Sequence, residues 1–193
     1  MRLLSTQDYQ RAAERLKCPL ASIRAVAEVE APRGGFDADG NPTTLFEGHH
    51  FYRLTRGKFA TSHPTLCFPE WTRKHYGKSR AEELDRLHRA QALDWEAACK
   101  ATSWGKFQIM GFNHYAAGFP DIRSFVTAMC ESEGQQLEAF CEFIESQGLA
   151  DEMQRADWKP FARVFNGPRF AENRYDIKLD AAYRKWALAA PTA

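Results

Sequence analysis

Apolar residues recur at intervals of three and four along most of the chain, which is the period of an amphipathic α-helix. This spacing predicts a helix from the candidate caps Ser5 and Thr6 to about Lys17, and a second helix after Pro19 that runs to Glu30. Further helices are predicted from Ser79 through Trp95, over Trp104 to Met110, over Asn113 to Ala117, after Asp121, over Glu133 to Ser146, from Asp157 through Phe165, and from about Phe170 to Ala187. The chain is therefore expected to be mostly helical.

A β-strand signal stands out in a single region. The turn dipeptides Asp39-Gly40 and Asn41-Pro42 precede the β-favouring run Thr43 to Phe46, and together they predict a small antiparallel hairpin. Residues 60–78 contain two prolines and several aromatic residues, which indicates an irregular packed loop. The expected fold class is α+β, predominantly α-helical, with one small antiparallel hairpin or sheet beside a helical lobe.

The composition is typical of one globular domain. The 193 residues are 44% hydrophobic and 13% aromatic, and the net charge of +1 argues against a dedicated nucleic-acid binder. No apolar run approaches the roughly 18 residues that a transmembrane helix needs, and the first residues lack the apolar stretch of a secretory signal. We therefore expect a monomeric single domain over residues 1–193, made in the cytoplasm and not inserted in a membrane, whose export needs outside help.

The cysteines and histidines suggest neither a disulfide framework nor a metal site. The five cysteines are scattered and contain no CxxC pair, which is typical of reduced thiols. One cluster of possible ligands has spacings that match no zinc pattern, so a structural or surface role is preferred for it. Its members are His49, His50, His63, Cys67 and His75. The acidic tract from Glu131 to Asp157 is interpreted as a solvated helix face.

Glu30 is a carboxylate on an apolar helix stripe. On a wheel of about 100° per residue, Ile23, Val26 and Ala27 all lie within about 60° of Glu30, whereas Glu28 points to the opposite side. Burial disfavours the charged form, so the pKa of Glu30 should rise, as a general acid near neutral pH requires. The alternative is a glutamate that snorkels at a helix end or pairs with Arg33.

Glu47 is the second candidate carboxylate. It ends the predicted strand and shares the face of Leu45 by the two-residue period of a strand. One carboxylate from a helix end and one from a facing strand is the arrangement used to cleave glycosidic bonds. The alternative is a strand-end glutamate that is tied to His49 or to an arginine.

Four segments in this order resemble the phage-type N-acetylmuramidase domain family of the lysozyme-like superfamily. They are AVAEVE with the following Gly-Gly-Phe, TTLFEGHHFYRL, ATSWGKFQIMGFNHYAAGF and FARVFNGPRFAENRYDIKLDAAYRKW. The likeness spans about residues 20–187 and leaves no room for a separate wall-binding domain. It implies a lysozyme-like fold and hydrolysis of the β-1,4 bond between N-acetylmuramic acid and N-acetylglucosamine in bacterial peptidoglycan, with no metal or other cofactor.

The resemblance also implies roles for individual residues. Glu30 matches the catalytic glutamate of the family, although Ala31 and Pro32 follow it where many relatives have Ser or a glycine-rich turn. Glu47 corresponds to the family's Phe-Glu motif and is the candidate second carboxylate.

The substrate-binding candidates come from the two later segments. In the SWGKFQIM segment, Ser103 and Gln108 are expected to face the groove, while Trp104, Phe107 and Ile109 pack in the core. Asn166 belongs to a turn in which the family's Tyr-Asn-Gly is Phe-Asn-Gly. Tyr175 could replace the missing hydroxyl, or it could be a packed helix residue.

Three other functions stay open on the sequence alone. A lytic transglycosylase of the same superfamily would leave 1,6-anhydro ends, a non-catalytic wall-binding module would not need Glu30, and a muramidase-blocking protein would have no reason to keep both Glu30 and Glu47. An endolysin released by a holin and an effector delivered by a secretion machine both fit a chain that reaches periplasmic peptidoglycan without its own signal.

Overall fold

The computed structural model describes residues 3–189 of the 193-residue chain. Within them the α-helices are α1 Thr6–Arg15, α2 Leu20–Glu30, α3 Gly48–Thr55, α4 Arg80–Leu93, α5 Trp95–Lys100, α6 Ile122–Glu131, α7 Glu133–Ser146, α8 Ala150–Arg155, α9 Trp158–Phe165 and α10 Tyr175–Ala189. A short 3₁₀ helix, η1, covers Gly111–Asn113, and the strands are β1 Thr44–Phe46, β2 Thr102–Trp104 and β3 Ile109–Met110. The predicted class, mostly helical with one small antiparallel sheet, is confirmed.

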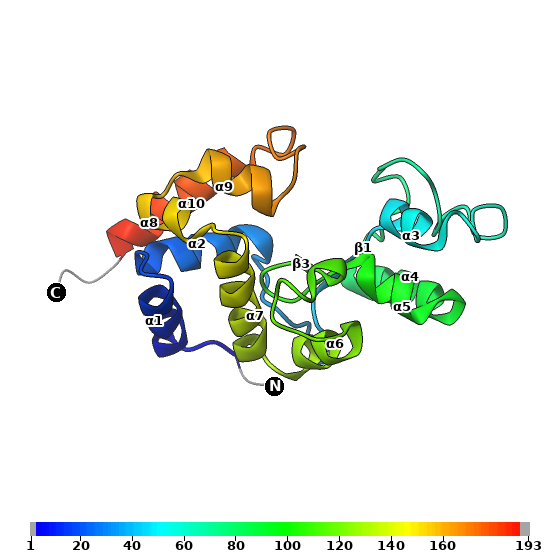
Figure 1. The fold of residues 1–193 in the computed structure, drawn as a ribbon, viewed down its shortest axis with the longest axis horizontal. Helices are drawn as coiled ribbons and strands as arrows, with labels where there is room; N and C mark the ends of the chain where they lie inside the picture. Colours follow the sequence, from blue (N-terminus) through cyan, green and yellow to red (C-terminus); the bar gives the residue numbers. More distant parts are fainter. Residues whose placement is uncertain (1–2, 190–193) are drawn as a thin grey trace.

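The helices divide into two groups on either side of the small sheet. Figure 1 shows α1, α2 and α7–α10 gathered on one side of β1 and β3, and α3–α5 on the other. The first group is held by a buried aromatic cluster in which Phe140 of α7 stacks on Phe107 (ring centroids 4.4 Å apart) and meets Phe165 edge-on. Burial of this cluster is the main source of stability for the helical lobe.

The second helix, α2, is clamped by the last one. Glu28, which points away from Glu30 and is partly exposed, accepts hydrogen bonds from Lys185 Nζ (2.8 Å) and Trp186 Nε1 (2.9 Å) of α10. At the other end of the same lobe, Ser5 caps α1 through a reciprocal pair of bonds with Asp8, as its sequence position predicted. The contacts of Glu28 hold α2, which ends at Glu30, against α10. The cap fixes the start of α1, the helix that precedes α2.

The sheet is built from distant segments. It has the order β1-β2-β3, with Leu45 opposite Ser103 and Ser103 opposite Met110 in antiparallel register. The predicted hairpin over residues 39–46 is present only as an isolated bridge between Phe36 and Pro42, and β1 finds its strand partner almost 60 residues further on. A local pattern reports that a segment is extended, but not which segment it pairs with.

The helix predicted over Trp104 to Met110 is wrong. Gly105 (φ +72°) and Gln108 (φ +49°) take left-handed backbone conformations, and they turn the chain between β2 and β3. Trp104, Phe107 and Ile109 are all buried, as the prediction required. Their spacing resembles that of a helix, but the residues belong to the tight hairpin formed by β2 and β3.

Several helix boundaries also differ from expectation. The helix predicted from Ser79 through Trp95 divides at Asp94, whose extended backbone ends α4 and whose side chain caps α5. The helix predicted over Asn113 to Ala117 is a turn that follows η1, and α10 begins at Tyr175 rather than near Phe170 because Arg174 has φ +55°. Asp157 precedes α9 without capping it, whereas Glu133–Ser146 and the Asp121-capped α6 are confirmed.

The acidic tract is not a simple solvated face. Arg15 of α1 donates to three carboxylates of α7, namely Glu138 (2.9 Å), Glu142 (2.6 Å) and Glu145 (2.6 Å). These groups are largely exposed, so the ion pairs add little stability and chiefly orient α1 on α7.

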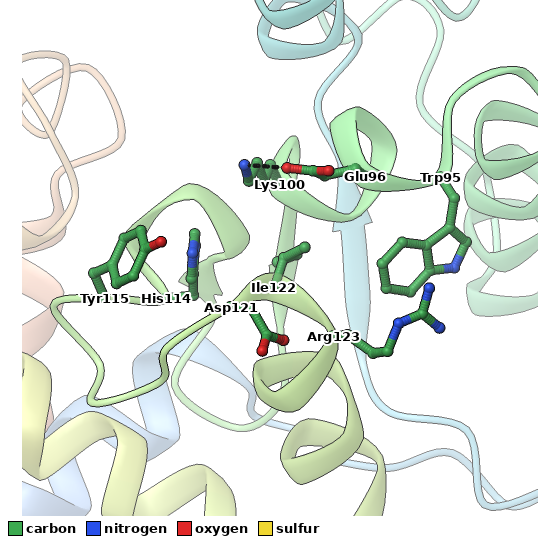
Figure 2. A pocket seen from close by; sticks show the side chains of 8 residues that line it. All are labelled: Trp95, Glu96, Lys100, His114, Tyr115, Asp121, Ile122 and Arg123. Carbon is green, nitrogen blue, oxygen red and sulfur yellow. Dashed lines mark hydrogen bonds and ion pairs between the residues drawn. The ribbon is translucent and has the colours of Figure 1, made fainter.

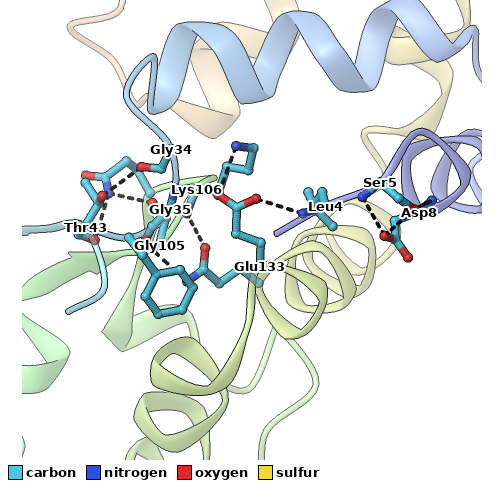
Figure 3. A network of polar contacts seen from close by, with 12 residues as sticks. Leu4, Ser5, Asp8, Gly34, Gly35, Thr43, Gly105, Lys106 and Glu133 are labelled. Carbon is cyan, nitrogen blue, oxygen red and sulfur yellow. Dashed lines mark hydrogen bonds and ion pairs between the residues drawn. The ribbon is translucent and has the colours of Figure 1, made fainter. Parts of the chain in front are cut away.

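Glu133, in the same tract, is buried at the start of α7 (Figure 3). Its carboxylate accepts hydrogen bonds from the N–H of Gly35 (2.7 Å), the N–H of Leu4 (3.0 Å) and Lys106 Nζ (3.1 Å). Burial alone would raise the pKa of Glu133, but these donors outweigh it and hold the pKa below its usual value. One carboxylate thus ties the N-terminus, the turn after α2 and the β2–β3 turn to α7.

Gln136 completes this network one helical turn further on. Its Oε1 accepts from the N–H of Lys106 (2.7 Å), and its Nε2 donates to the carbonyl of Met129 (2.8 Å). A Cβ added at Gly105 would lie 2.6 Å from the Gln136 side chain. Only a glycine therefore lets the Gln136 side chain come this close to the backbone of the β2–β3 turn.

We predict that Glu133→Gln lowers the free energy of unfolding at pH 7 by about 2 kcal/mol, because the buried charge that accepts three hydrogen bonds is lost. A lowered carboxyl pKa contributes stability above the unfolded-state pKa of about 4.3, and this contribution disappears as the pH falls through the lower folded-state pKa. The difference between parent and variant should therefore shrink at acid pH. Urea unfolding at several pH values measures it.

The matched control is Glu131→Gln, two residues earlier and exposed. It should change the free energy of unfolding by less than about 0.5 kcal/mol at every pH. Equal effects of the two substitutions would contradict the role given to Glu133.

Candidate active site

Glu30 is the last residue of α2, and Ala31, with φ −139°, ends the helix directly after it. Glu30 as a whole is partly exposed, but its carboxylate is closely surrounded, and Asn166 Nδ2 donates to its Oε1 at 2.7 Å. Burial raises the pKa of Glu30 to about 7, although Asn166 and the positive charge of Lys178 act in the opposite direction. The rise in pKa that the helical wheel predicted is present. Among the described residues, Arg33 forms no ion pair with Glu30.

Asn166 follows α9 at its C-cap position and brings an amide to the Glu30 carboxylate. Its Oδ1 is buried and has no hydrogen-bond partner among the described residues. An amide can serve both protonation states of an acid, because its N–H₂ donates to the carboxylate and its oxygen, after a flip, accepts from the neutral carboxyl. The sequence predicted that Asn166 contacts the substrate, and in the structure its amide donates a hydrogen bond to Glu30.

Glu47 lies between β1 and α3 and is mostly buried. Tyr76 donates its hydroxyl proton to Glu47 Oε1 at 2.6 Å, and His49 Nδ1 lies 3.3 Å from Oε2. His49 thus lies beside Glu47 without a hydrogen bond between Nδ1 and Oε2, whereas Tyr76 is a hydrogen-bond partner that the sequence did not suggest. Tyr76 comes from the irregular segment 60–78, where the clustered aromatic residues were the only sign of a packed role.

His50, next to His49, is neutral at physiological pH. Burial lowers its pKa to about 4, assisted by His49 and Arg53 and opposed by Glu47. Its ring contacts Phe112 at 5.1 Å between centroids. His50 therefore adds no positive charge near Glu47 at neutral pH.

Tyr175 lies close enough to both carboxylates for their charges to act on its hydroxyl. It is the first residue of α10, and burial raises its pKa to about 12, with further contributions from the negative charges of Glu30 and Glu47 and an opposite one from Arg73. Tyr175 thus lies in the field of both glutamates, which come from different sides of the sheet. Its hydroxyl stays protonated and can both donate and accept a hydrogen bond.

Beyond Tyr175, side chains from the two sides of the molecule touch. Arg73 donates to Asn173 Oδ1, and the guanidinium of Arg169 lies over the ring of Trp71, 5.4 Å from its centroid. The loop before Tyr76 and the loop before Tyr175 are joined by these contacts. Tyr76, which contacts Glu47, and Tyr175, which lies near both glutamates, therefore follow two loops that these contacts hold together.

Ser103 and Gln108 form hydrogen bonds to each other and to nearby backbone. Ser103 is buried and donates to Gln108 Oε1 at 2.8 Å, while Gln108 Nε2 donates to the carbonyls of Gly105 (2.8 Å) and Thr43 (3.3 Å). Because these groups satisfy one another, they brace the β2–β3 turn against the chain that leads into β1. The substrate contacts expected of both residues stay a prediction beside this structural role.

The histidines and cysteines of the site region pack rather than ligate. The rings of His49 and His50 are in tilted contact (4.0 Å between centroids), as are those of His75 and Phe68 (5.0 Å). Within residues 3–189 no group of three or more His, Cys, Asp or Glu side chains is arranged to hold a metal ion. All five cysteines are free thiols, and four of them are buried.

Comparison with known proteins assigns the chain to a family. The model of the muramidase family, described as N-acetylmuramidase, matches residues 19–187 and so includes both glutamates, Asn166 and Tyr175. The chain belongs to the N-acetylmuramidase family. The resemblance seen in the sequence is therefore confirmed.

Two phage proteins are similar to this muramidase-family chain. The endolysin of Enterobacteria phage PRD1 is 35% identical over 86 residues, which cover 42% of this chain and 54% of that protein. The chain thus spans about half the length of this curated relative. The crystal structure of the Burkholderia AP3 phage endolysin matches 97% of this chain and 72% of its own, with a TM-score of 0.83 and 42% identity.

We predict that Asn166→Ala raises the pKa of Glu30 further above its present value of about 7, because the N–H that stabilises the carboxylate is lost while the burial stays. A ¹³C NMR titration of the Glu30 carboxyl carbon measures this pKa directly. Asn173→Ala, in the same loop but bonded to Arg73, is the matched control and should leave the pKa of Glu30 unchanged. A fall in the pKa on removal of Asn166 would contradict the arrangement.

Proposed function

We propose that this chain hydrolyses the β-1,4 bond between N-acetylmuramic acid and N-acetylglucosamine in peptidoglycan, with Glu30 as the general acid. The observation that carries the proposal is the carboxyl of Glu30, whose pKa is raised to about 7 and which Asn166 holds in place. Such a group is about half protonated at pH 7, whereas a carboxyl with an ordinary pKa is almost fully ionised, so Glu30 can give its proton away near neutral pH. The match of the N-acetylmuramidase family over residues 19–187 supports this choice of bond.

In the proposed reaction Glu30 transfers its proton to the glycosidic oxygen as the bond from that oxygen to the anomeric carbon breaks. The leaving sugar departs as an alcohol, and the other sugar develops oxocarbenium-like positive charge. A water molecule then adds to the anomeric carbon and gives one proton to a carboxylate, so that a reducing end forms. The acceptor is the ionised Glu30 if the water attacks from the side of the leaving group, and Glu47 if it attacks from the opposite side. Asn166 is a positioning residue in this scheme, since it contacts Glu30 and keeps the carboxyl oriented in both protonation states.

Glu47 is proposed as the second carboxylate. The hydrogen bond from Tyr76 and the nearby His49 fix its orientation, and an ionised Glu47 would stabilise the developing positive charge or hold the attacking water. Tyr175 is proposed to bind substrate, because its neutral hydroxyl lies within the field of both glutamates.

The proposed partner is therefore the glycan strand of bacterial peptidoglycan. The similarity to two phage endolysins supports a lytic role in which the protein is made in the cytoplasm and reaches the periplasm through a holin or a secretion machine. Among the described residues, no helix combines the length and the apolar character needed to cross a bilayer.

We predict that Glu30→Gln abolishes the release of fragments from purified peptidoglycan, with a loss of at least about 10³-fold in rate, because the amide has no proton to transfer. Mass spectrometry of the ends released by the parent identifies the reaction. Reducible muramic-acid ends support hydrolysis, whereas 1,6-anhydro ends would show that the protein is a transglycosylase. A folded parent with no activity would show that it is a binding module.

Two measurements accompany this test. The kcat/KM of the parent should fall as the pH rises above about 7, since Glu30 then loses the proton it must donate. Glu30→Gln should unfold at pH 8 at the same temperature as the parent or a higher one, because it removes a buried ionised carboxylate. Lower stability of the variant would attribute its inactivity to misfolding.

We predict that Glu47→Gln lowers kcat by about 10²-fold or more and that Tyr76→Phe lowers it less, by about tenfold, because Tyr76 only orients the carboxylate. The KM should change little in both variants. Tyr52→Phe, a tyrosine of α3 outside the Glu47 contacts, is the control and should keep full activity. Full activity of Glu47→Gln would leave Glu30 as the sole catalytic carboxylate.

A further inference from the structure

A separate hollow of about 490 Å³ lies where α5, the turn after η1 and the start of α6 meet (Figure 2). It is lined by Trp95, Glu96, Lys100, His114, Tyr115, Asp121, Ile122 and Arg123. Neither glutamate of the candidate active site contributes to it, and neither does Tyr175. The hollow therefore requires its own explanation.

Two aromatic side chains stand at opposite ends of this hollow. Figure 2 shows Tyr115 beside His114 at one end and Trp95 beside Arg123 at the other, with Ile122 between them. Tyr115 is 72% exposed, although its ring packs on that of His114 with 4.2 Å between centroids. An exposed aromatic ring held in place by a buried neighbour offers a rigid apolar surface at low entropic cost, as ligand-binding sites do.

The charged groups of the hollow balance one another. Lys100 bonds Glu96 at 2.5 Å, and Arg123 stacks on Trp95 with its guanidinium 4.6 Å from the ring centroid. Asp121 supplies the remaining charge as the cap of α6. The two cations, Lys100 and Arg123, are thus matched by two carboxylates, Glu96 and Asp121, and the lining offers donors and acceptors beside apolar surface.

His114 adds a directed polar group. It is 4% exposed, and its Nδ1 lies 2.9 Å from the carbonyl oxygen of Gly111, to which it donates. In the neutral ring Nε2 is then an acceptor. A hydroxyl or an acetamido N–H can supply the matching donor.

We propose that this hollow is a second glycan-binding site that takes one or two sugar residues of an N-acetylated polymer. Sugars present apolar C–H faces to aromatic rings and hydroxyl groups to planar guanidinium and carboxylate groups, and N-acetylglucosamine carries no charge. The volume fits this class of ligand. The choice of the polymer rests on the proposed function, whereas the existence of a sugar site does not.

The hollow is connected to the candidate active site through one segment of chain. Phe112, two residues before His114, contacts His50 in the helix that follows Glu47. A polymer held at two points dissociates more slowly than one held at a single point, because release of one contact leaves the other in place. The second site should therefore strengthen attachment to the polymer without changing the chemical step.

The test uses binding and does not depend on hydrolysis. In the Glu30→Gln background, Tyr115→Ala should weaken sedimentation with insoluble peptidoglycan about three- to tenfold. The kcat/KM of Tyr115→Ala on a soluble tetrasaccharide should stay within about twofold of the parent. Leu188→Ala, which truncates another exposed apolar residue, is the control and should bind as its parent does. Unchanged sedimentation of Tyr115→Ala would overturn the proposal.

NMR titration identifies the ligand class. N-acetylglucosamine oligomers should shift the indole N–H signal of Trp95 and the amide signals around Tyr115 in the Glu30→Gln protein, and Tyr115→Ala should weaken the effect. Shifts there with a free stem peptide, but not with the oligosaccharide, would overturn the sugar assignment. A protein that binds the oligomers here but hydrolyses nothing would keep this site and remove the proposed function.

Discussion

The buried carboxylate of Glu133 is the contact on which the position of the turn after α2 relative to the sheet depends. It is placed at the start of α7 by the helix sequence, and its three donors come from the N-terminus, from the turn after Glu30 and from the β2–β3 turn. A charge in this position is stable only while all three donors surround it, because an uncompensated buried charge is very costly. The network therefore fixes where α2 ends relative to the sheet, and with it the place of Glu30.

The site itself works against stability. A carboxyl whose pKa rises from about 4.3 in the unfolded chain to about 7 in the folded protein destabilises the fold progressively as the pH rises between these values. The clamp of α10 on Glu28 and the buried aromatic core around Phe140 supply stability in the same lobe. The opposite behaviour of Glu133, whose pKa is lowered, shows that burial alone does not decide the outcome, since Glu133 has three donors and Glu30 has one.

The two glutamates also differ in how they are held. Glu30 has one amide partner that can adapt to either protonation state, which suits a group that must give up and regain a proton. Glu47 has a short hydrogen bond from Tyr76 and a histidine beside it, which suits a group that keeps one orientation. The roles proposed for them follow from this difference in surroundings rather than from their residue type, which is the same.

The sequence by itself determined the helical class, the caps Ser5 and Asp121, the bounds Glu133–Ser146, the family, and the position of Glu30 on a buried stripe. These follow from local spacing or from motif order, which a chain carries without being folded. The partner of β1, the hairpin around Gly105, the contacts of Asn166 and Tyr76, and the inward pairing of Ser103 with Gln108 were decided only by the tertiary structure. Each of these features depends on contacts with residues elsewhere in the chain. A local sequence pattern indicates whether a segment is helical or extended, but it does not identify the residues that the segment contacts.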